Sequence, residues 1–238
     1  MKVTTLPITS RPTELAMKTM KKKSTAGCIL AIDLGKYKSV ACVYPSGAES
    51  EIRYATFDTS PDEMSALLEQ VKPSVLVIEA CALSGWVYDL ATEHGVPCRV
   101  ANTASEAWKF KHTKRKTDRD DALRLAQLFV LGQLPTVTIP PKADRQWKSG
   151  IVARQALVGR RIAVQNRIRG LLLGQGLPMP RGARAWTELG LKGIEQLARP
   201  LADCPLEELW RGLVGQAIAE FRQVQELLDV VEKKLGAI

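Results

Sequence analysis

Four acidic residues stand where carboxylates commonly do chemistry. Asp33 closes the apolar run GCILAID, and Glu79 closes a second run, SVLVIE. Asp118 and Asp121 follow in the segment KTDRDDALRLAQL, three residues apart, so that on a helix they share one face. Because like charges repel, four clustered carboxylates would be stable as anions only with cations between them. Their types and order therefore predict a divalent metal site.

The chemistry predicted for this site is metal-assisted reaction of a phosphodiester. Mg²⁺ and Mn²⁺ prefer hard oxygen ligands, and two such ions about 3.5–4 Å apart can activate an attacking oxygen and stabilise the leaving one. We expect all four carboxylates to be catalytic and to ligate two Mg²⁺ or Mn²⁺ ions. Nearby basic side chains would counter the phosphate charge. These are Lys114, Arg115, Lys116 and Arg119.

Each acidic residue also has a structural alternative. Asp118 could cap a helix, with Asp121 favouring its amino end, and Asp33 could form a turn. Glu79 directly follows the apolar residues VLVI and is therefore expected to lie next to the buried core. A carboxylate at such a position needs a partner. At helical spacing Asp120 points away from the face shared by its two acidic neighbours, and we interpret it as solvated.

Composition and charge favour an anionic partner. The 238 residues contain 34 Lys and Arg against 25 Asp and Glu, a net charge of +9. No segment reaches the roughly 18 apolar residues of a membrane span, so no membrane association is expected. The five cysteines include no C-x-x-C pair, which favours buried, reduced thiols in a cytoplasmic protein.

The elements that must position the carboxylates follow from the hydrophobic pattern. The order is strand, strand, strand, helix, strand, helix, strand, helix, which predicts a mixed sheet flanked by helices, the order of the ribonuclease-H-like fold. If the strands ending at Asp33 and Glu79 are adjacent and parallel, both carboxylates emerge at one sheet edge. The expected strands cover 27–34, 38–44, 50–57, 74–79 and 97–101, and the helices cover 60–70, 85–93 and 118–131.

The composition changes along the chain and indicates four parts. A flexible basic arm is expected over 1–25, a catalytic domain over 26–134, a linker over 135–144 and a helical region over 145–238. The last helix, about 206–235, has apolar residues spaced by three and four from Trp210 to Leu235. This heptad-like stripe could pack within the chain or join two copies, and we expect a homo-oligomer formed through it.

A basic helical segment is the second candidate nucleic-acid surface. Between Arg145 and Thr187 there are nine basic residues and no acidic one, so phosphate binding with steep salt dependence is expected. Trp147 and Trp186 flank this segment and could either stack on bases or anchor the core. The arginines expected to bind nucleic acid are Arg154, Arg160, Arg161, Arg167 and Arg169.

The chain resembles the DEDD transposases of bacterial insertion sequences, a group related to the Piv/MooV DNA invertases. The motifs that match are AIDLGKYKSVACVY, VLVIEACALSGWVYDLATEHGVPCRVAN, KHTKRKTDRDDALRLAQL and RQWKSGIVARQALVGRRIAVQNRIRGLL. The resemblance implies a RuvC-like first domain and Mg²⁺-dependent DNA recombination, and it assigns the family's acidic tetrad to Asp33, Glu79, Asp118 and Asp121.

The resemblance also implies partners and a longer protein. DNA is the expected partner, together with a structured RNA from the same element, at the bacterial nucleoid. Members of the family continue into a second domain with a serine proposed to attack DNA. We expect this chain to correspond to the amino-terminal part of such a transposase, truncated before that domain.

Two other functions fit parts of the sequence. The segment IDLGKYKSVACVY is similar to the first phosphate loop of actin-like and sugar-kinase-like ATPases, although the second phosphate loop and the adenosine loop of those proteins are not found. A non-catalytic fragment that binds nucleic acid and regulates the full enzyme is the other alternative.

Overall fold

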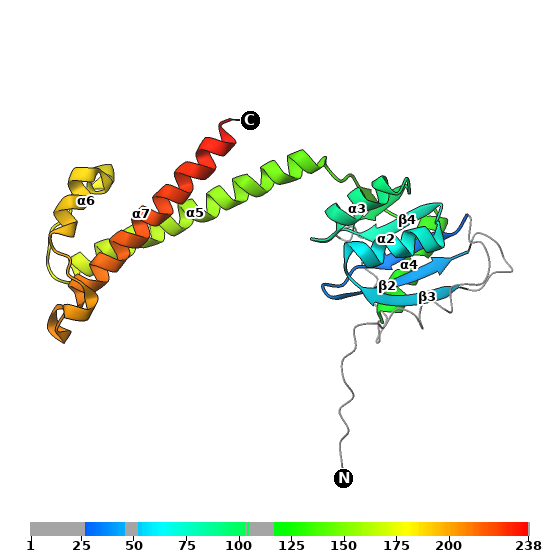
Figure 1. The fold of residues 1–238 in the computed structure, drawn as a ribbon, viewed down its shortest axis with the longest axis horizontal. Coiled ribbons are helices and arrows are strands. Elements are labelled where there is room, and N and C mark those ends of the chain that lie inside the picture. Colours follow the sequence, from blue (N-terminus) through cyan, green and yellow to red (C-terminus); the bar gives the residue numbers. More distant parts are fainter. Residues whose placement is uncertain (1–26, 46–51, 103, 105–116, 238) are drawn as a thin grey trace, which may run out of the picture. The chain divides into compact units, whose positions relative to one another are not determined.

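The computed structural model describes residues 27–45, 52–102, 104 and 117–237, and the chain divides into two compact units between Lys142 and Ala143. The first unit is a mixed sheet flanked by helices (Figure 1). Its strands are β1 (Ile29–Asp33), β2 (Lys38–Tyr44), β3 (Arg53–Asp58), β4 (Val75–Glu79), β5 (Cys98–Ala101) and β6 (Thr136–Val137). Its helices are α2 (Pro61–Val71), α3 (Ser84–Glu93) and α4 (Asp118–Val130).

The topology of the sheet matches the prediction. In the described residues the strand order is β3-β2-β1-β4-β5-β6. The first three strands form the antiparallel meander, β4 runs parallel to β1, and β5 runs parallel to β4. The expected mixed sheet, with the strand order of the ribonuclease-H-like fold, is therefore confirmed. One difference lies in the segment expected as a linker, because β6 pairs antiparallel to β5 with Val137 opposite Val100.

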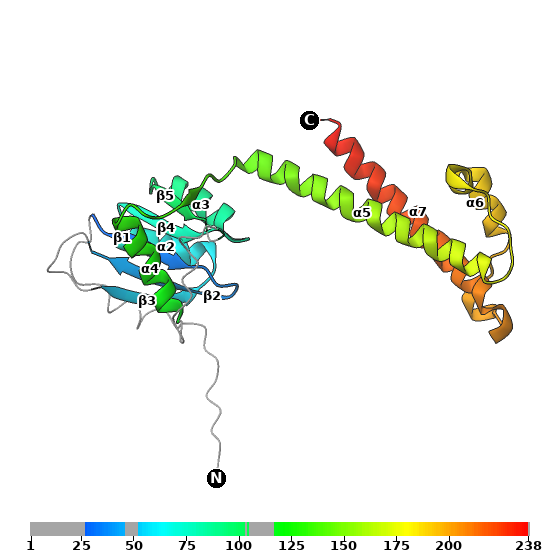
Figure 2. The same ribbon diagram turned by 180° about the vertical axis from the view of Figure 1, so that it is seen from behind.

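Alternation along the strands explains why helices cover both faces of the sheet. Leu30 and Ile32 of β1 point into a core shared with α2 and α3. Ile29 and Ala31, one residue out of phase, point into a second core shared with α4. Figures 1 and 2, seen from opposite sides, show α2 and α3 on one face and α4 on the other.

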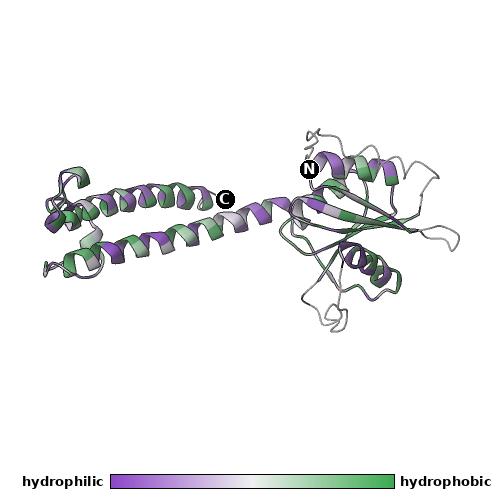
Figure 3. Cartoon of the chain, turned by 90° about the horizontal axis from the view of Figure 1, so that it is seen from below, coloured by the Kyte–Doolittle hydropathy of each residue, from purple (hydrophilic) through white to green (hydrophobic). Residues whose placement is uncertain are grey.

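The second unit is helical. Its long helices are α5 (Lys142–Leu173) and α7 (Leu209–Leu235), with the short α6 (Glu188–Glu195) between them in sequence. Single turns of 3₁₀ helix occupy η2 (Gly182–Trp186), η3 (Leu201–Asp203) and η4 (Leu206–Glu208). Buried residues of α5 such as Ile168 pack with Phe221 of α7. The polar and apolar residues that alternate along both helices are visible in Figure 3.

The apolar stripe of α7 is used inside the chain. Ala217, Phe221, Val224 and Leu228 are all at most 4% exposed, and the contacts Arg154–Glu232 and Arg167–Glu220 join α7 to α5 (Figure 3). The intramolecular alternative therefore describes this stripe, and its buried residues are not available for a second copy. Among the helices that the structure describes, none is long and apolar enough to cross a membrane.

Candidate carboxylate site at the sheet edge

The pairing of β1 with β4 brings two of the predicted carboxylates to the same edge. Ile32 is the register partner of Ile78 in this parallel pair, and each is followed directly by an acidic residue. Asp33 ends β1 and Glu79 ends β4, and both are partly buried. The carboxyl ends of adjacent parallel strands thus present Asp33 and Glu79 as neighbours, as the sequence predicted.

A capping box fixes the start of the helix that bears the other two carboxylates. The hydroxyl of Thr117 accepts a hydrogen bond from the backbone N–H of Asp120, while the Asp120 carboxylate accepts hydrogen bonds from the Thr117 backbone N–H at 3.0 Å and from its hydroxyl at 2.7 Å. Asp118 is therefore not the cap, so that alternative is wrong. Asp120 is exposed, but its carboxylate takes part in the capping box. The interpretation of Asp120 as a merely solvated residue is therefore corrected.

Packing of α4 determines which side of the helix turns towards the sheet. Ala122, Leu125 and Ala126 are buried against Ala31 of β1 and Val77 of β4. One turn before this buried face the helix begins, with the exposed Asp118, and then the partly buried Asp121. The apolar face therefore holds the first turn of α4 near the end of β1.

Electrostatics show that three of the carboxylates interact. The pKa of Asp33 is raised above its ordinary value of 3.8, first because burial removes water from the carboxylate and then because of the negative charges of Asp121 and Asp118. Residues 85 or more positions apart in sequence therefore act on one another through space. The result is an acidic centre at which the anionic forms repel.

The donor chemistry of this centre fits a divalent cation. Carboxylate oxygens are the ligands that Mg²⁺ and Mn²⁺ prefer, and a cation would relieve the repulsion that raises the pKa of Asp33. In the part of the chain that the structure describes, no three Asp, Glu, His or Cys side chains stand close enough together to hold one ion. Ligation would therefore require the carboxylates of this centre to converge further.

The basic residues predicted beside the carboxylates are placed only in part. Lys114, Arg115 and Lys116 lie outside the described residues. Arg119, on the first turn of α4, lies with its guanidinium carbon 5.6 Å from the centre of the Tyr54 ring on β3. The side chain that was expected to face phosphate thus lies over an aromatic ring of the sheet.

The arginines of α5 are matched by acidic residues of α7, which are distant in sequence. Arg154 contacts Glu232 at 2.7 Å, and both Arg160 and Arg167 contact Glu220 at 3.0 Å. The arginine-rich segment itself contains no acidic residue, but in the folded chain acidic residues of α7 lie beside its arginines. Because these pairs lie at the surface, their contribution to stability is small.

The remaining predicted residues of α5 also have partners. Arg161 donates to the side chain of Gln225 at 3.2 Å, and Arg169 lies 5.0 Å from the centre of the Trp186 ring. Trp186 in turn packs against Phe221, with ring centres 5.3 Å apart, so it is a core anchor. Trp147 is 48% exposed and keeps both of its predicted roles open.

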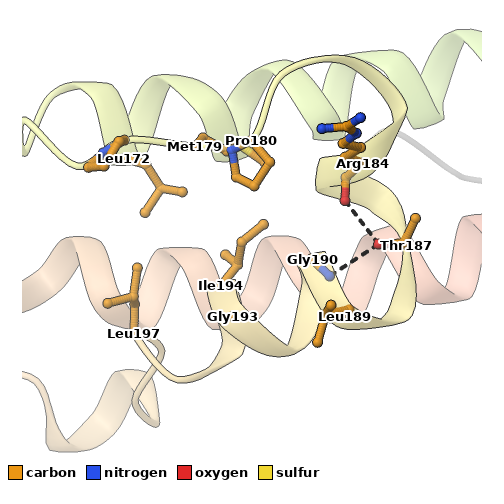
Figure 4. A pocket seen from close by; sticks show the side chains of 11 residues that line it. Leu172, Met179, Pro180, Arg184, Thr187, Leu189, Gly190, Gly193, Ile194 and Leu197 are labelled. Carbon is orange, nitrogen blue, oxygen red and sulfur yellow. Dashed lines mark hydrogen bonds between the residues drawn. The ribbon is translucent and has the colours of Figure 1, made fainter.

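The helical unit also contains an apolar pocket of about 500 Å³ (Figure 4). Leu172, Met179 and Ile194 line it. The Thr187 hydroxyl at its rim donates to the backbone carbonyl of Arg184 at 2.9 Å and accepts from the N–H of Gly190 at 3.2 Å. Both hydrogen bonds serve the start of α6, so the polar groups at the rim are structural.

Two features of the site were missed in the sequence. The pattern Thr117-x-x-Asp120 is a capping-box signal, and it was available in the letters TDRD. The partnership of Glu220 with Arg160 and Arg167 joins residues more than 50 positions apart. No local pattern could have indicated it, because it depends on the antiparallel register of two helices.

Comparison with known proteins gives a consistent assignment. A family model of IS110-type DEDD transposases matches residues 30–175, which is more than half of the chain. The Sinorhizobium fredii protein y4qE, to which a transposase function is attributed, is 26% identical over 209 residues. That alignment covers 85% of this chain and 52% of the relative, so the chain spans about half the length of the curated relative it matches.

Solved structures of RuvC from Thermus thermophilus are also similar. The RuvC structure alone is 16% identical, with a TM-score of 0.32, and the match covers 46% of this chain and 99% of RuvC. RuvC in complex with a Holliday junction substrate is likewise 16% identical, with a TM-score of 0.32, over 47% of this chain and 99% of that one.

Proposed function

Because the chain belongs to the DEDD transposase family of the IS110 type, we propose that its first unit acts on DNA phosphodiesters through the carboxylates at the sheet edge. The observation that supports this most strongly is the parallel register of β1 and β4, which places Asp33 and Glu79 at one sheet edge, where Asp118 and Asp121 act electrostatically on Asp33. A family of DNA-rearranging enzymes and an acidic centre in a protein of net charge +9 together favour DNA over a small anionic substrate.

The proposed chemistry needs cations at the acidic centre. Two Mg²⁺ or Mn²⁺ ions bound there would supply Lewis-acid stabilisation of the phosphodiester. The role of the chain is to hold the ligands. Asp33 and Glu79 are fixed by adjacent strands, whereas Asp118 and Asp121 are fixed by a capped and packed helix.

The α5 arginines are a second part of the proposal. Their contacts with α7 are exposed, with Arg154, Arg160 and Arg167 side chains 45–56% accessible, so exchange of these partners for DNA phosphates would cost little. A DNA substrate would place the protein in the bacterial cytoplasm, at the nucleoid. A structured RNA partner, expected from the resemblance, and a homo-oligomer remain predictions.

Cleavage of a four-way DNA junction tests the proposal. The full chain is incubated with the labelled junction in Mg²⁺, and binding is measured in parallel with Mg²⁺ replaced by chelator. Asp33→Asn and Glu79→Gln should each lower the cleavage rate by about 100-fold or more, because they remove anionic ligands of the cations that would stabilise the transition state. Asp62→Asn is the control for the loss of one carboxylate away from the site, because Asp62 is an exposed aspartate in the first turn of α2, on the other face of the sheet.

The results separate the candidate functions. Cleavage that depends on the carboxylates, with binding retained, supports the transposase chemistry. Equal cleavage by wild type and both variants contradicts it. Binding by the wild type without cleavage in Mg²⁺ or Mn²⁺ would instead favour the non-catalytic nucleic-acid-binding alternative.

A further inference from the structure

The turn that joins β1 to β2 presents an aromatic side chain to solvent next to the acidic centre. Tyr37 is 74% exposed, and it lies four residues after Asp33 at the same edge of the sheet. The amino group of Lys36 stands 5.0 Å from the centre of the Tyr37 ring. An exposed aromatic ring at the sheet edge that carries Asp33 is placed where a base of a DNA substrate could stack on it.

Buried hydrogen bonds hold this turn in one conformation. Thr59, which follows β3, donates its backbone N–H to the carbonyl of Tyr37 at 2.9 Å and its hydroxyl to the carbonyl of Gly35 at 2.8 Å. The hydroxyl of Ser39, a fully buried residue, lies 2.7 Å from that of Thr59. These hydrogen bonds thus connect the turn to the ends of β2 and β3.

Close packing of the backbone tightens the same turn. A side-chain carbon at Gly35 would stand 2.1 Å from the carbonyl oxygen of Lys38, which no real contact allows. Gly35 is therefore required by a close approach of two backbone segments. A tyrosine on so constrained a turn loses little conformational freedom when it binds, which favours affinity.

We propose that Tyr37 and Lys36 form a DNA contact beside the carboxylates, with the Tyr37 ring stacked on an unpaired base and Lys36 against the adjoining phosphate. The inference rests on the proposed function and adds to it the kind of substrate. A single exposed ring can stack only on a base whose face is open. The substrate is therefore branched or locally single-stranded DNA and not a continuous duplex.

Binding measurements on the full chain test this contact without cleavage. The probe is a fluorescein-labelled four-way DNA junction in chelator, followed by fluorescence anisotropy. Tyr37→Ala should raise the Kd by about 5- to 150-fold, the range that corresponds to 1–3 kcal/mol per stacked base. Tyr37→Trp should stay close to wild type. Leu131→Ala, at an exposed residue beyond the far end of α4, is the matched control and should leave the Kd unchanged.

Two further readouts separate stacking from a general loss of affinity. Lys36→Ala should reduce the salt dependence of binding by about one counterion. A junction with 2-aminopurine at the branch point should lose fluorescence on binding wild type, because stacking quenches it, and keep its fluorescence with Tyr37→Ala. On a fully paired linear duplex, wild type and Tyr37→Ala should bind alike.

Several outcomes would overturn the inference. An unchanged Kd and unchanged 2-aminopurine quenching in Tyr37→Ala, in a wild-type chain that binds and cleaves the junction, rejects the contact while the proposed function stands. Tighter Tyr37-dependent binding of the same junction made of RNA rejects DNA as the ligand. A wild-type chain that neither binds nor cleaves the DNA junction rejects the proposed function and the contact together.

Discussion

Ile32 and Ile78 are opposite each other in a parallel strand pair, and each is followed by an acidic residue. The pairing of two buried isoleucines, both 0% exposed, thus determines that Asp33 and Glu79 leave the sheet as neighbours. Hydrophobic packing fixes the register, and the register fixes the candidate catalytic groups. The position of Asp33 beside Asp118 and Asp121 has measurable consequences for stability and pH dependence.

The first prediction concerns the charge of Asp33 in metal-free protein. Its pKa is raised from 3.8, so between 3.8 and the raised value the folded chain holds more protons than the unfolded chain. Stability therefore falls as pH rises through that window, and the full penalty is present above it. Asp33→Asn should raise the Tm of the metal-free chain at pH 7, and the difference from wild type should shrink as the pH approaches 3.8.

Added Mg²⁺ should make the wild type more stable than Asp33→Asn. Mg²⁺ that binds only the folded protein stabilises it in proportion to its affinity, and Asp33→Asn should gain less Tm than wild type on Mg²⁺ addition. Thermal denaturation in chelator and in Mg²⁺ measures both effects. An Asp33→Asn variant that is less stable than wild type in chelator would contradict a destabilising charge at Asp33.

The second prediction concerns the capping box of α4. Thr117→Ala removes the hydroxyl that accepts from the Asp120 N–H, and should cost about 1 kcal/mol in unfolding free energy. Hydrogen bonds from Thr117 lower the pKa of Asp120. Their contribution to stability is therefore fully present at pH values above the ordinary pKa of Asp120, and it is lost as the pH falls through the lowered pKa. Urea denaturation at pH 7 measures the cost. Thr117→Ser, which keeps the hydroxyl, should be close to wild type, and an equal loss in both variants would contradict the capping role.

The third prediction concerns Glu220 as a neutralising partner of α5. Hydrogen bonding from Arg160, together with Arg167, lowers the pKa of Glu220, so the carboxylate is ionised at neutral pH. Glu220→Gln should leave the fold intact, release two guanidinium groups and tighten binding of a DNA junction several-fold at low salt, with a steeper salt dependence. Glu226→Gln, on an exposed position of the same helix, provides the comparison. Equal affinity for wild type and Glu220→Gln would argue against α5 as a DNA surface.

The fourth prediction contrasts two helical glycines in the second unit. A methyl group at Gly212 of α7 would stand 2.5 Å from Cδ1 and 2.7 Å from Cα of Leu201, whereas one at Gly170 of α5 would project into open space. Gly212→Ala should therefore destabilise the helical unit by about 1–3 kcal/mol, and Gly170→Ala should stabilise it by about 0.5–1 kcal/mol. Calorimetric unfolding of both variants checks the sign. The packing of η3 on α7 would be disproved if Gly212→Ala were also stabilising.

Much of the first unit could be predicted because its sequence is locally consistent. The strand predicted over 38–44 coincides with β2, and the helix predicted from Asp118 differs at its end by one residue. Continuous apolar runs in β1 and β4 indicated both strands and their burial on two faces. The proximity of Asp33 to Glu79 followed from one topological assumption, the parallel pairing of these strands.

The rest depends on interactions that local patterns do not contain. The short β6 was hidden in a proline-bounded segment, PTVTIPP, because a two-residue strand has no measurable period. The partners of Arg160 and Arg167 depend on how α7 packs against α5, which the arginine-rich sequence alone does not specify. The same packing decides that the α7 stripe faces inward.

Binding of Mn²⁺ to the full chain, followed by electron paramagnetic resonance, tests the central claim most directly. The wild type and the Asp62→Asn control should bind Mn²⁺ with equal stoichiometry and affinity, and Mg²⁺ should compete. The double variant Asp33→Asn, Asp121→Asn should lose at least one bound ion. Unchanged Mn²⁺ binding in that double variant would contradict the account, because the acidic centre would then not be the metal site.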